Sequence, residues 1–257
     1  MMQRWKITIE YNGAPFCGWQ RQPDKSSVQG AIQDALFKFC QQPIEIQGAG
    51  RTDAGVHARA QIAHFDLDYN KVMNGHEIAK AINAHLHPHP ISIVHAEIVA
   101  DDFHARFEAK NKLYVYRIVT RTAQLTIDKG LAWHRHKMLD HEAMHEAAQL
   151  LLGVHDFSSF RAGDCQAKSP IRSIDRLDVV CTDYDDFGGK EITVYVEGQA
   201  FLHHMVRNIV GSLVLVGKGK WAVSDMSTAL AARERKAAGP TAAPHGLYLM
   251  RIDYPKP

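Results

Sequence analysis

The sequence predicts an α+β fold built from two similar halves that flank a central cleft. Segments in which apolar and polar residues alternate recur along the whole chain, and this pattern is typical of strands with one buried face. Segments with apolar residues every three or four positions lie between them, as in helices with one buried face. No stretch rich in proline, glycine or serine separates the halves, so we expect them to pack closely around the cleft.

The first half of the chain has the predicted order strand, helix, strand, strand, helix, strand. Residues 5–11 alternate between apolar and polar side chains, which predicts a strand. Ser26-x-x-Gln29 has the spacing of a capping box, which predicts a helix that begins there. The other elements expected in this half are strands over 44–48, 58–67 and 91–99 and a helix over 75–86. This order is that of a ferredoxin-like unit.

The second half repeats this order approximately. Asp140 is a suitable N-cap for a helix that ends near Gly153. The other elements expected here are strands over 114–119, 177–179, 192–196 and 247–252 and an apolar helix over 202–216. We therefore expect two ferredoxin-like domains with antiparallel or mixed sheets, the first over residues 1–103 and the second over residues 104–257.

The composition excludes several classes of protein. The chain has 257 residues, of which 46% are hydrophobic, and no apolar run is long enough to span a membrane. Its first residues lack the apolar core of a signal peptide, so we expect a cytoplasmic protein. None of the four cysteines forms a Cys-x-x-Cys pair, so neither a zinc ribbon nor a redox motif is indicated.

The net charge of +2 does not by itself indicate a nucleic-acid-binding protein, but the charge is unevenly distributed. One segment holds five basic residues and a single acid, Glu108; the basic residues are Arg106, Lys110, Lys112, Arg117 and Arg121. Such a cluster can neutralise phosphate groups of RNA. A solvated basic surface without a ligand is the alternative interpretation.

The loop between the second and third predicted strands has the composition of a reactive site. Gly48-Ala49-Gly50-Arg51-Thr52-Asp53-Ala54-Gly55-Val56-His57-Ala58 combines three glycines with two opposite charges. Glycines permit backbone conformations and close approaches that side chains forbid, and loops held by rigid strands often carry reacting groups. A plain hairpin is the alternative, but it needs only one or two turn residues. The spacing of a phosphate-binding loop is absent.

The same loop resembles the signature of the TruA family of tRNA pseudouridine synthases. The resemblance extends over nearly the whole chain through these further motifs: Gly18-Trp19-Gln20, Asp102-Phe103-His104-Ala105-Arg106-Phe107, Tyr114-Val115-Tyr116, Asp156-Phe157-Ser158-Ser159-Phe160, Phe201-Leu202-His203-His204-Met205-Val206-Arg207-Asn208 and Gly246-Leu247-Tyr248-Leu249. It implies the pseudouridine synthase fold and an isomerase that turns uridine into pseudouridine without a cofactor.

The resemblance also implies roles for individual residues. Asp53 is the catalytic carboxylate, which either stabilises or attacks the anomeric carbon or takes a sugar proton. Arg207 pairs with it as a cation, and Tyr114 is the active-site tyrosine, able to stack on the flipped uracil. Arg51 helps to flip or hold the target nucleotide. Leu247 forms part of the apolar wall beneath the uracil ring.

The implied substrate is the anticodon arm of tRNA, with uridines 38, 39 and 40 as targets. The family acts as homodimers that hold one tRNA across both subunits, so two modest basic surfaces would line one groove. In this chain we expect the RNA contacts to include Arg106, Lys110 and Lys112.

Two other classes of protein compete with this interpretation. A non-catalytic RNA-binding protein would keep the basic residues but would not need Asp53 beside Arg51. A metallohydrolase is conceivable because the chain has 16 histidines. His141-Glu142-x-x-His145 has the spacing of a zincin motif, but the resemblance to the pseudouridine synthases implies a reaction without a cofactor, so we expect no metal.

Overall fold

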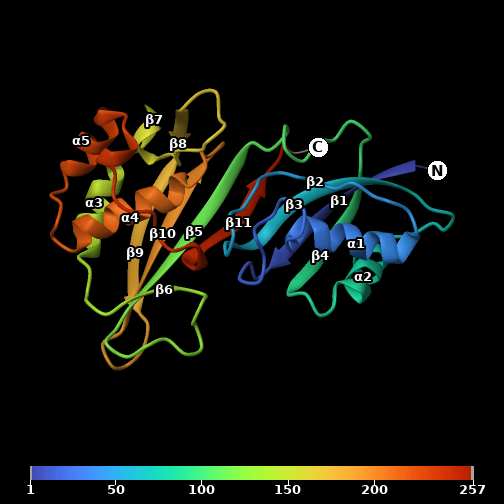
Figure 1. Cartoon of the computed structure of the whole chain (residues 1–257), viewed down its shortest axis with the longest axis horizontal. Helices are drawn as coiled ribbons and strands as arrows, with labels where there is room; N and C mark the ends of the chain where they lie inside the picture. The colour runs from blue at the N-terminus through green and yellow to red at the C-terminus, as the bar shows by residue number, and fades with distance from the viewer. Residues whose placement is uncertain (1, 256–257) are drawn as a thin grey trace. The chain divides into compact units, whose positions relative to one another are not determined.

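The computed structural model describes residues 2–255, in which strands and helices alternate along the chain (Figure 1). This alternation confirms the predicted α+β class. The chain divides into two units, one made of residues 1–110 and 248–257 and the other of residues 111–247. The domain boundary at residue 103 and the ferredoxin-like description of each half stay predictions. No helix within residues 2–255 has the length and apolar character needed to cross a membrane.

The first unit is organised by the long central strand β1 (Met2–Tyr11). Trp5, Ile7 and Ile9 are buried and alternate with partly exposed residues, as the sequence pattern predicts. The other strands are β2 (Gln47–Gly48), β3 (His57–Asp68), β4 (Ile91–Val99) and β11 (Leu247–Asp253). β1 lies between β3 and β4, antiparallel to both, while β3 also pairs with β2 and, in parallel, with β11.

Two helices lie side by side on one face of this sheet, namely α1 (Val28–Cys40) and α2 (Gly75–Leu86) (Figure 1). The bounds of α2 agree with the prediction because Asn74 and Glu77 form a capping box. The predicted start of α1 is wrong by one residue. Ser27 is its N-cap, since the Ser27 hydroxyl accepts the Gly30 N–H at 3.2 Å.

The second unit is built around β5 (Asn111–Thr120), β10 (Lys190–Gly198) and β9 (Arg176–Asp183). β10 is antiparallel to both of its neighbours. A short strand, β6 (Trp133–Arg135), runs parallel to β5. Two further short strands, β7 (Gly153–Asp156) and β8 (Ile171–Ile174), pair only with each other. The prediction missed β6, β7 and β8, because three or four residues are too few to show an alternation.

The helices of the second unit are α3 (His141–Gln149), α4 (Met205–Gly217) and α5 (Asp225–Ala232). Three single turns of 3-10 helix also occur, at Ser158–Phe160, Arg235–Ala237 and Pro244–Gly246. α3 begins after Asp140, whose carboxylate accepts the Ala143 N–H as predicted, but it ends at Gln149, before the predicted end near Gly153. α4 begins three residues later than predicted, and its side chains are buried along almost its whole length.

Candidate active site

The loop that carries Asp53 joins β2 to β3 and is held by the segment around Gly18 and Trp19. Gly18 and Asp53 form an isolated antiparallel bridge, and the Trp19 N–H donates to the Thr52 carbonyl at 3.0 Å. On the other side of Asp53, its carbonyl accepts the Val56 N–H at 3.1 Å. The backbone is therefore fixed on both sides of the half-buried carboxylate.

Close packing explains why small residues occupy two positions beside this loop. Gly18 has φ +113°, and a Cβ at this position would lie only 2.6 Å from the Thr52 carbonyl oxygen. A Cβ on Gly48 would lie within 2.7 Å of the indole ring of buried Trp19. The Gly18-Trp19 motif thus supports the backbone of the Asp53 loop and does not supply reacting groups.

Buried polar side chains hold the loop from the sheet. The Tyr11 hydroxyl and the Thr52 hydroxyl are 2.7 Å apart in a buried hydrogen bond. Gln61, which is fully buried on β3, donates from its amide to the Gly50 carbonyl at 2.9 Å. Burial raises the pKa of Tyr11 far above its ordinary value, so the phenol stays neutral.

The sequence prediction did not identify Tyr11 and Gln61 as supports of the site. A signal for Gln61 does exist in the sequence, since it shares the period-two face of β3 with buried Ala63 and Phe65. A polar residue on a buried face must find a hydrogen-bond partner. Nothing in the sequence, however, indicates that this partner is Gly50.

His57, at the end of the same loop, joins three segments of the first unit. Its Nδ1 accepts the Gly13 N–H at 3.1 Å. Its ring stacks on Tyr248 of β11, with 4.7 Å between the ring centroids. His57 and Tyr248 are also partners in the parallel pairing of β3 and β11. This buried histidine therefore has a structural role.

In the second unit, Arg207 lies in the first turn of α4 and is anchored to residue 242. Its Nε donates to the Ala242 carbonyl at 2.9 Å, and its own carbonyl accepts the Ala242 N–H at 3.1 Å. The Arg207 side chain is half-buried, and its charge acts on Tyr116 and His245. Burial and this cation together hold the pKa of His245 below its ordinary value.

Two predicted residues of the second unit are buried next to aromatic or sheet neighbours. Tyr114 on β5 is 8% exposed and meets the ring of Phe201 edge-on, with 5.3 Å between the centroids. Leu247 is 5% exposed and is the first residue of β11. Lys112 is half-buried on β5. The positions of Tyr114 and Leu247 are compatible with an aromatic and apolar surface against which a base could lie.

The predicted residues fall into two groups. Arg51, Asp53, Arg106 and Lys110 belong to the first unit, where Arg51, Arg106 and Lys110 are exposed. Lys112, Tyr114, Arg207 and Leu247 belong to the second unit. The pairing of Asp53 with Arg207 joins residues of different units and stays a proposal.

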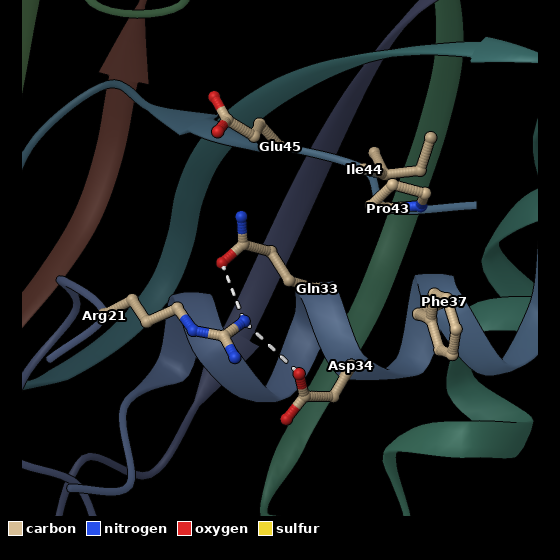
Figure 2. A pocket seen from close by; sticks show the side chains of 7 residues that line it. All are labelled: Arg21, Gln33, Asp34, Phe37, Pro43, Ile44 and Glu45. Carbon is tan, nitrogen blue, oxygen red and sulfur yellow. Dashed lines mark hydrogen bonds and ion pairs between the residues drawn. The ribbon is translucent and has the colours of Figure 1, made fainter. Parts of the chain in front are cut away.

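A surface pocket of about 210 Å³ lies in the first unit between α1 and the chain before β2 (Figure 2). Three of its polar side chains pair with one another, since the Arg21 Nη1 lies 3.3 Å from the Asp34 carboxylate and 3.4 Å from the Gln33 amide oxygen. None of the residues predicted for the active site lines this pocket. We therefore assign no ligand to it.

Comparison with known proteins identifies relatives that match nearly the whole chain. The family model described as tRNA pseudouridine synthase matches residues 7–108 and 147–255. The tRNA pseudouridine synthase A of Rhodopseudomonas palustris strain HaA2 is 50% identical over 253 residues, covering 98% of this chain and all of that protein. The protein of the same name from Nitrobacter winogradskyi is 51% identical, covering 98% and 96% respectively.

Proposed function

Because this chain belongs to the tRNA pseudouridine synthase family, we propose that it isomerises uridine to pseudouridine in tRNA. Its targets are uridines 38, 39 and 40 of the anticodon stem-loop. The observation that supports this proposal most directly is the fixed loop around Asp53, which holds one half-buried carboxylate beside an exposed arginine within the matched region.

The reaction breaks the bond between C1′ and N1 of uridine and forms a bond between C1′ and C5. N1 gains a proton and C5 loses one, so the product has the composition of the substrate and no redox partner is needed. The Asp53 carboxylate serves this chemistry either by stabilising or attacking the electron-poor C1′ or by taking a sugar proton. Both roles require the carboxylate to be ionised and held in place.

The other residues bind and orient the nucleotide in this proposal. Arg207 pairs with Asp53 as its counter-ion. Arg51 helps to bring the uridine out of the stack, since a base inside a helix is not accessible to the enzyme. Tyr114 stacks on the extruded uracil or assists removal of the C5 proton, and Leu247 supplies an apolar wall.

We further propose that Arg106, Lys110 and Lys112 contact RNA phosphates and that a homodimer holds one tRNA. A dimer doubles the basic surface available to the substrate, which compensates for a net charge of only +2 per chain. The protein acts in the cytoplasm, without a metal ion or cofactor. Full activity in excess chelator is the expected result, and a loss that added metal restores would contradict this point.

Mapping of pseudouridine in tRNA tests the proposed function. Cells with and without this protein are compared position by position, and the purified protein is then incubated with unmodified transcripts of the same tRNAs. We expect the loss in cells, and the gain with the purified protein, to be confined to positions 38–40. Modification confined to another arm would refute the target, whereas no modification by the purified protein would refute the activity.

A further inference from the structure

A short turn at residues 105–108, in the first unit, is held by hydrogen bonds from side chains of neighbouring segments. The Ala105 N–H donates to the Nδ1 of His64 on β3 at 3.2 Å. The Ala105 carbonyl accepts the Tyr254 hydroxyl at 2.6 Å. Just before the turn, the Phe103 carbonyl accepts the Nη1 of Arg4 at 3.1 Å. The turn is thus tied to two strands and to the C-terminal segment.

A second set of hydrogen bonds closes the turn from inside. The Nδ1 of His104 accepts the N–H groups of Arg106 and Phe107, at 3.2 Å and 3.4 Å. The His104 N–H donates to the Glu108 carboxylate, and the Glu108 N–H donates back to the His104 carbonyl at 3.1 Å. With so many of its backbone groups engaged, the turn has little freedom to rearrange.

This rigid turn displays an aromatic ring to solvent. Phe107 is 77% exposed, although a phenylalanine usually gains free energy when it is buried. One side of its ring contacts the ring of His104, with 4.2 Å between the centroids and 31° between the planes. Beside it, the side chain of Arg106 is also exposed. The ring therefore packs against His104 on one side and presents an apolar surface to solvent.

We propose that Phe107 is a stacking platform for an unpaired RNA base and that Arg106 contacts a neighbouring phosphate. Proteins that bind unpaired RNA present aromatic rings on which bases stack, next to cations that neutralise the backbone. A platform that is rigid before binding loses little entropy when the base arrives. This inference rests on the proposed function, because tRNA is taken as the source of the base.

The variant Phe107→Ala tests the platform by separating binding from chemistry and from folding. We expect the dissociation constant for tRNA to rise about 5-fold to 150-fold, the range of one base–aromatic stack. The single-turnover rate at saturating tRNA should stay unchanged, because Phe107 takes no part in the reaction. Urea unfolding should also stay unchanged, because most of the ring is already in water.

Three further variants make the test specific. Phe107→Trp keeps an aromatic plane and should restore tight binding, whereas Phe107→Leu keeps apolar bulk only and should not. Phe187 is 94% exposed on the turn between β9 and β10, so Phe187→Ala is the matched control and should bind tRNA normally. The affinity of Arg106→Ala for tRNA should depend less steeply on salt concentration. The slope of log affinity against log salt should fall by about the amount expected for one lost phosphate contact.

The inference is overturned if Phe107→Ala binds tRNA as tightly as the unaltered protein, or if Phe107→Leu restores full affinity. It is also overturned if Phe107→Ala lowers the mass of the oligomer without a loss of tRNA affinity, because the ring would then serve a protein contact. Failure of the proposed function has a different signature, namely no pseudouridine formed by the unaltered protein. The binding comparison would still decide whether the platform exists.

Discussion

Single side chains decide whether the Asp53 loop keeps its shape, and the pair formed by Tyr11 and Thr52 illustrates how. Both side chains are buried, so neither hydroxyl can exchange its partner for bulk water. A buried polar group that loses its partner destabilises the folded state by more than an intact hydrogen bond contributes to it. The pair therefore connects strand β1 to the loop, and this connection is lost when either side chain is replaced.

We predict that Tyr11→Phe lowers the free energy of unfolding by about 1–3 kcal/mol, because it leaves the Thr52 hydroxyl without its partner. Thr52→Val should have a similar effect, and the double variant should be less destabilised than the sum of the two. Urea unfolding of the four proteins measures this coupling. Tyr69→Phe, in a half-buried tyrosine packed against Phe39, is the control. Additive effects would show that the two hydroxyls do not interact.

The shape of the Asp53 loop also depends on a glycine at position 18. Gly18→Ala combines an unfavourable positive φ with a Cβ 2.6 Å from the Thr52 carbonyl, so the loop beside Asp53 must move. We predict a loss of about 1–3 kcal/mol in stability and at least about a tenfold loss of single-turnover rate. Gly188→Ala is the matched control, since Gly188 also has positive φ but open space around it. Equal effects of the two variants would contradict the role of the close contact.

At the scale of elements, strand β3 links the site loop to the turn at residues 105–108. His57, Gln61 and His64 on this strand are buried and bind backbone groups of Gly13, Gly50 and Ala105, respectively. Three polar side chains of one strand thus fix three loops. Burial, together with the nearby His104 and Arg4, lowers the pKa of His64 to about 4.

The sign of the resulting pH dependence follows from proton binding. The unfolded chain protonates this histidine near its ordinary pKa of about 6.5, whereas the folded chain does so near 4. Stability is therefore fully present above pH 6.5 and is lost progressively as the pH falls toward 4. We predict that His64→Gln flattens the stability profile between pH 6.5 and pH 5. His95→Gln, in an exposed histidine of β4, is the control, and an unchanged slope in His64→Gln would refute the prediction.

The elements also show what the sequence can and cannot predict. The bounds of α2 were predictable because Asn74 and Glu77 form a local capping box. The start of α1 was not, because the Gln29 side chain binds the Arg21 N–H and the Ile46 carbonyl instead of closing a box with Ser26. β6, β7 and β8 depend on pairing with distant segments, and so short a strand carries no periodic signal.

For the molecule as a whole, the family and the candidate loop were predictable from the sequence, whereas the supports of the loop were not. The glycines and charges of the Asp53 loop are contiguous in the chain and visible without a structure. Tyr11 and Gln61 act on residues 41 and 11 positions away, so only the folded chain shows their roles. The structure thus adds the reason why Asp53 is held in place, while its partner Arg207 stays a proposal.

The most direct test of the central claim compares Asp53→Asn with the unaltered protein on the same unmodified tRNA. The amide keeps the size of the side chain but removes the charge and the basic oxygen, and Asp186→Asn, on an exposed turn, is the control. We predict that pseudouridine formation in a single turnover falls at least about 1,000-fold while tRNA affinity changes less than about twofold. Product formed by Asp53→Asn at the normal rate would contradict the assignment of this carboxylate as the catalytic group.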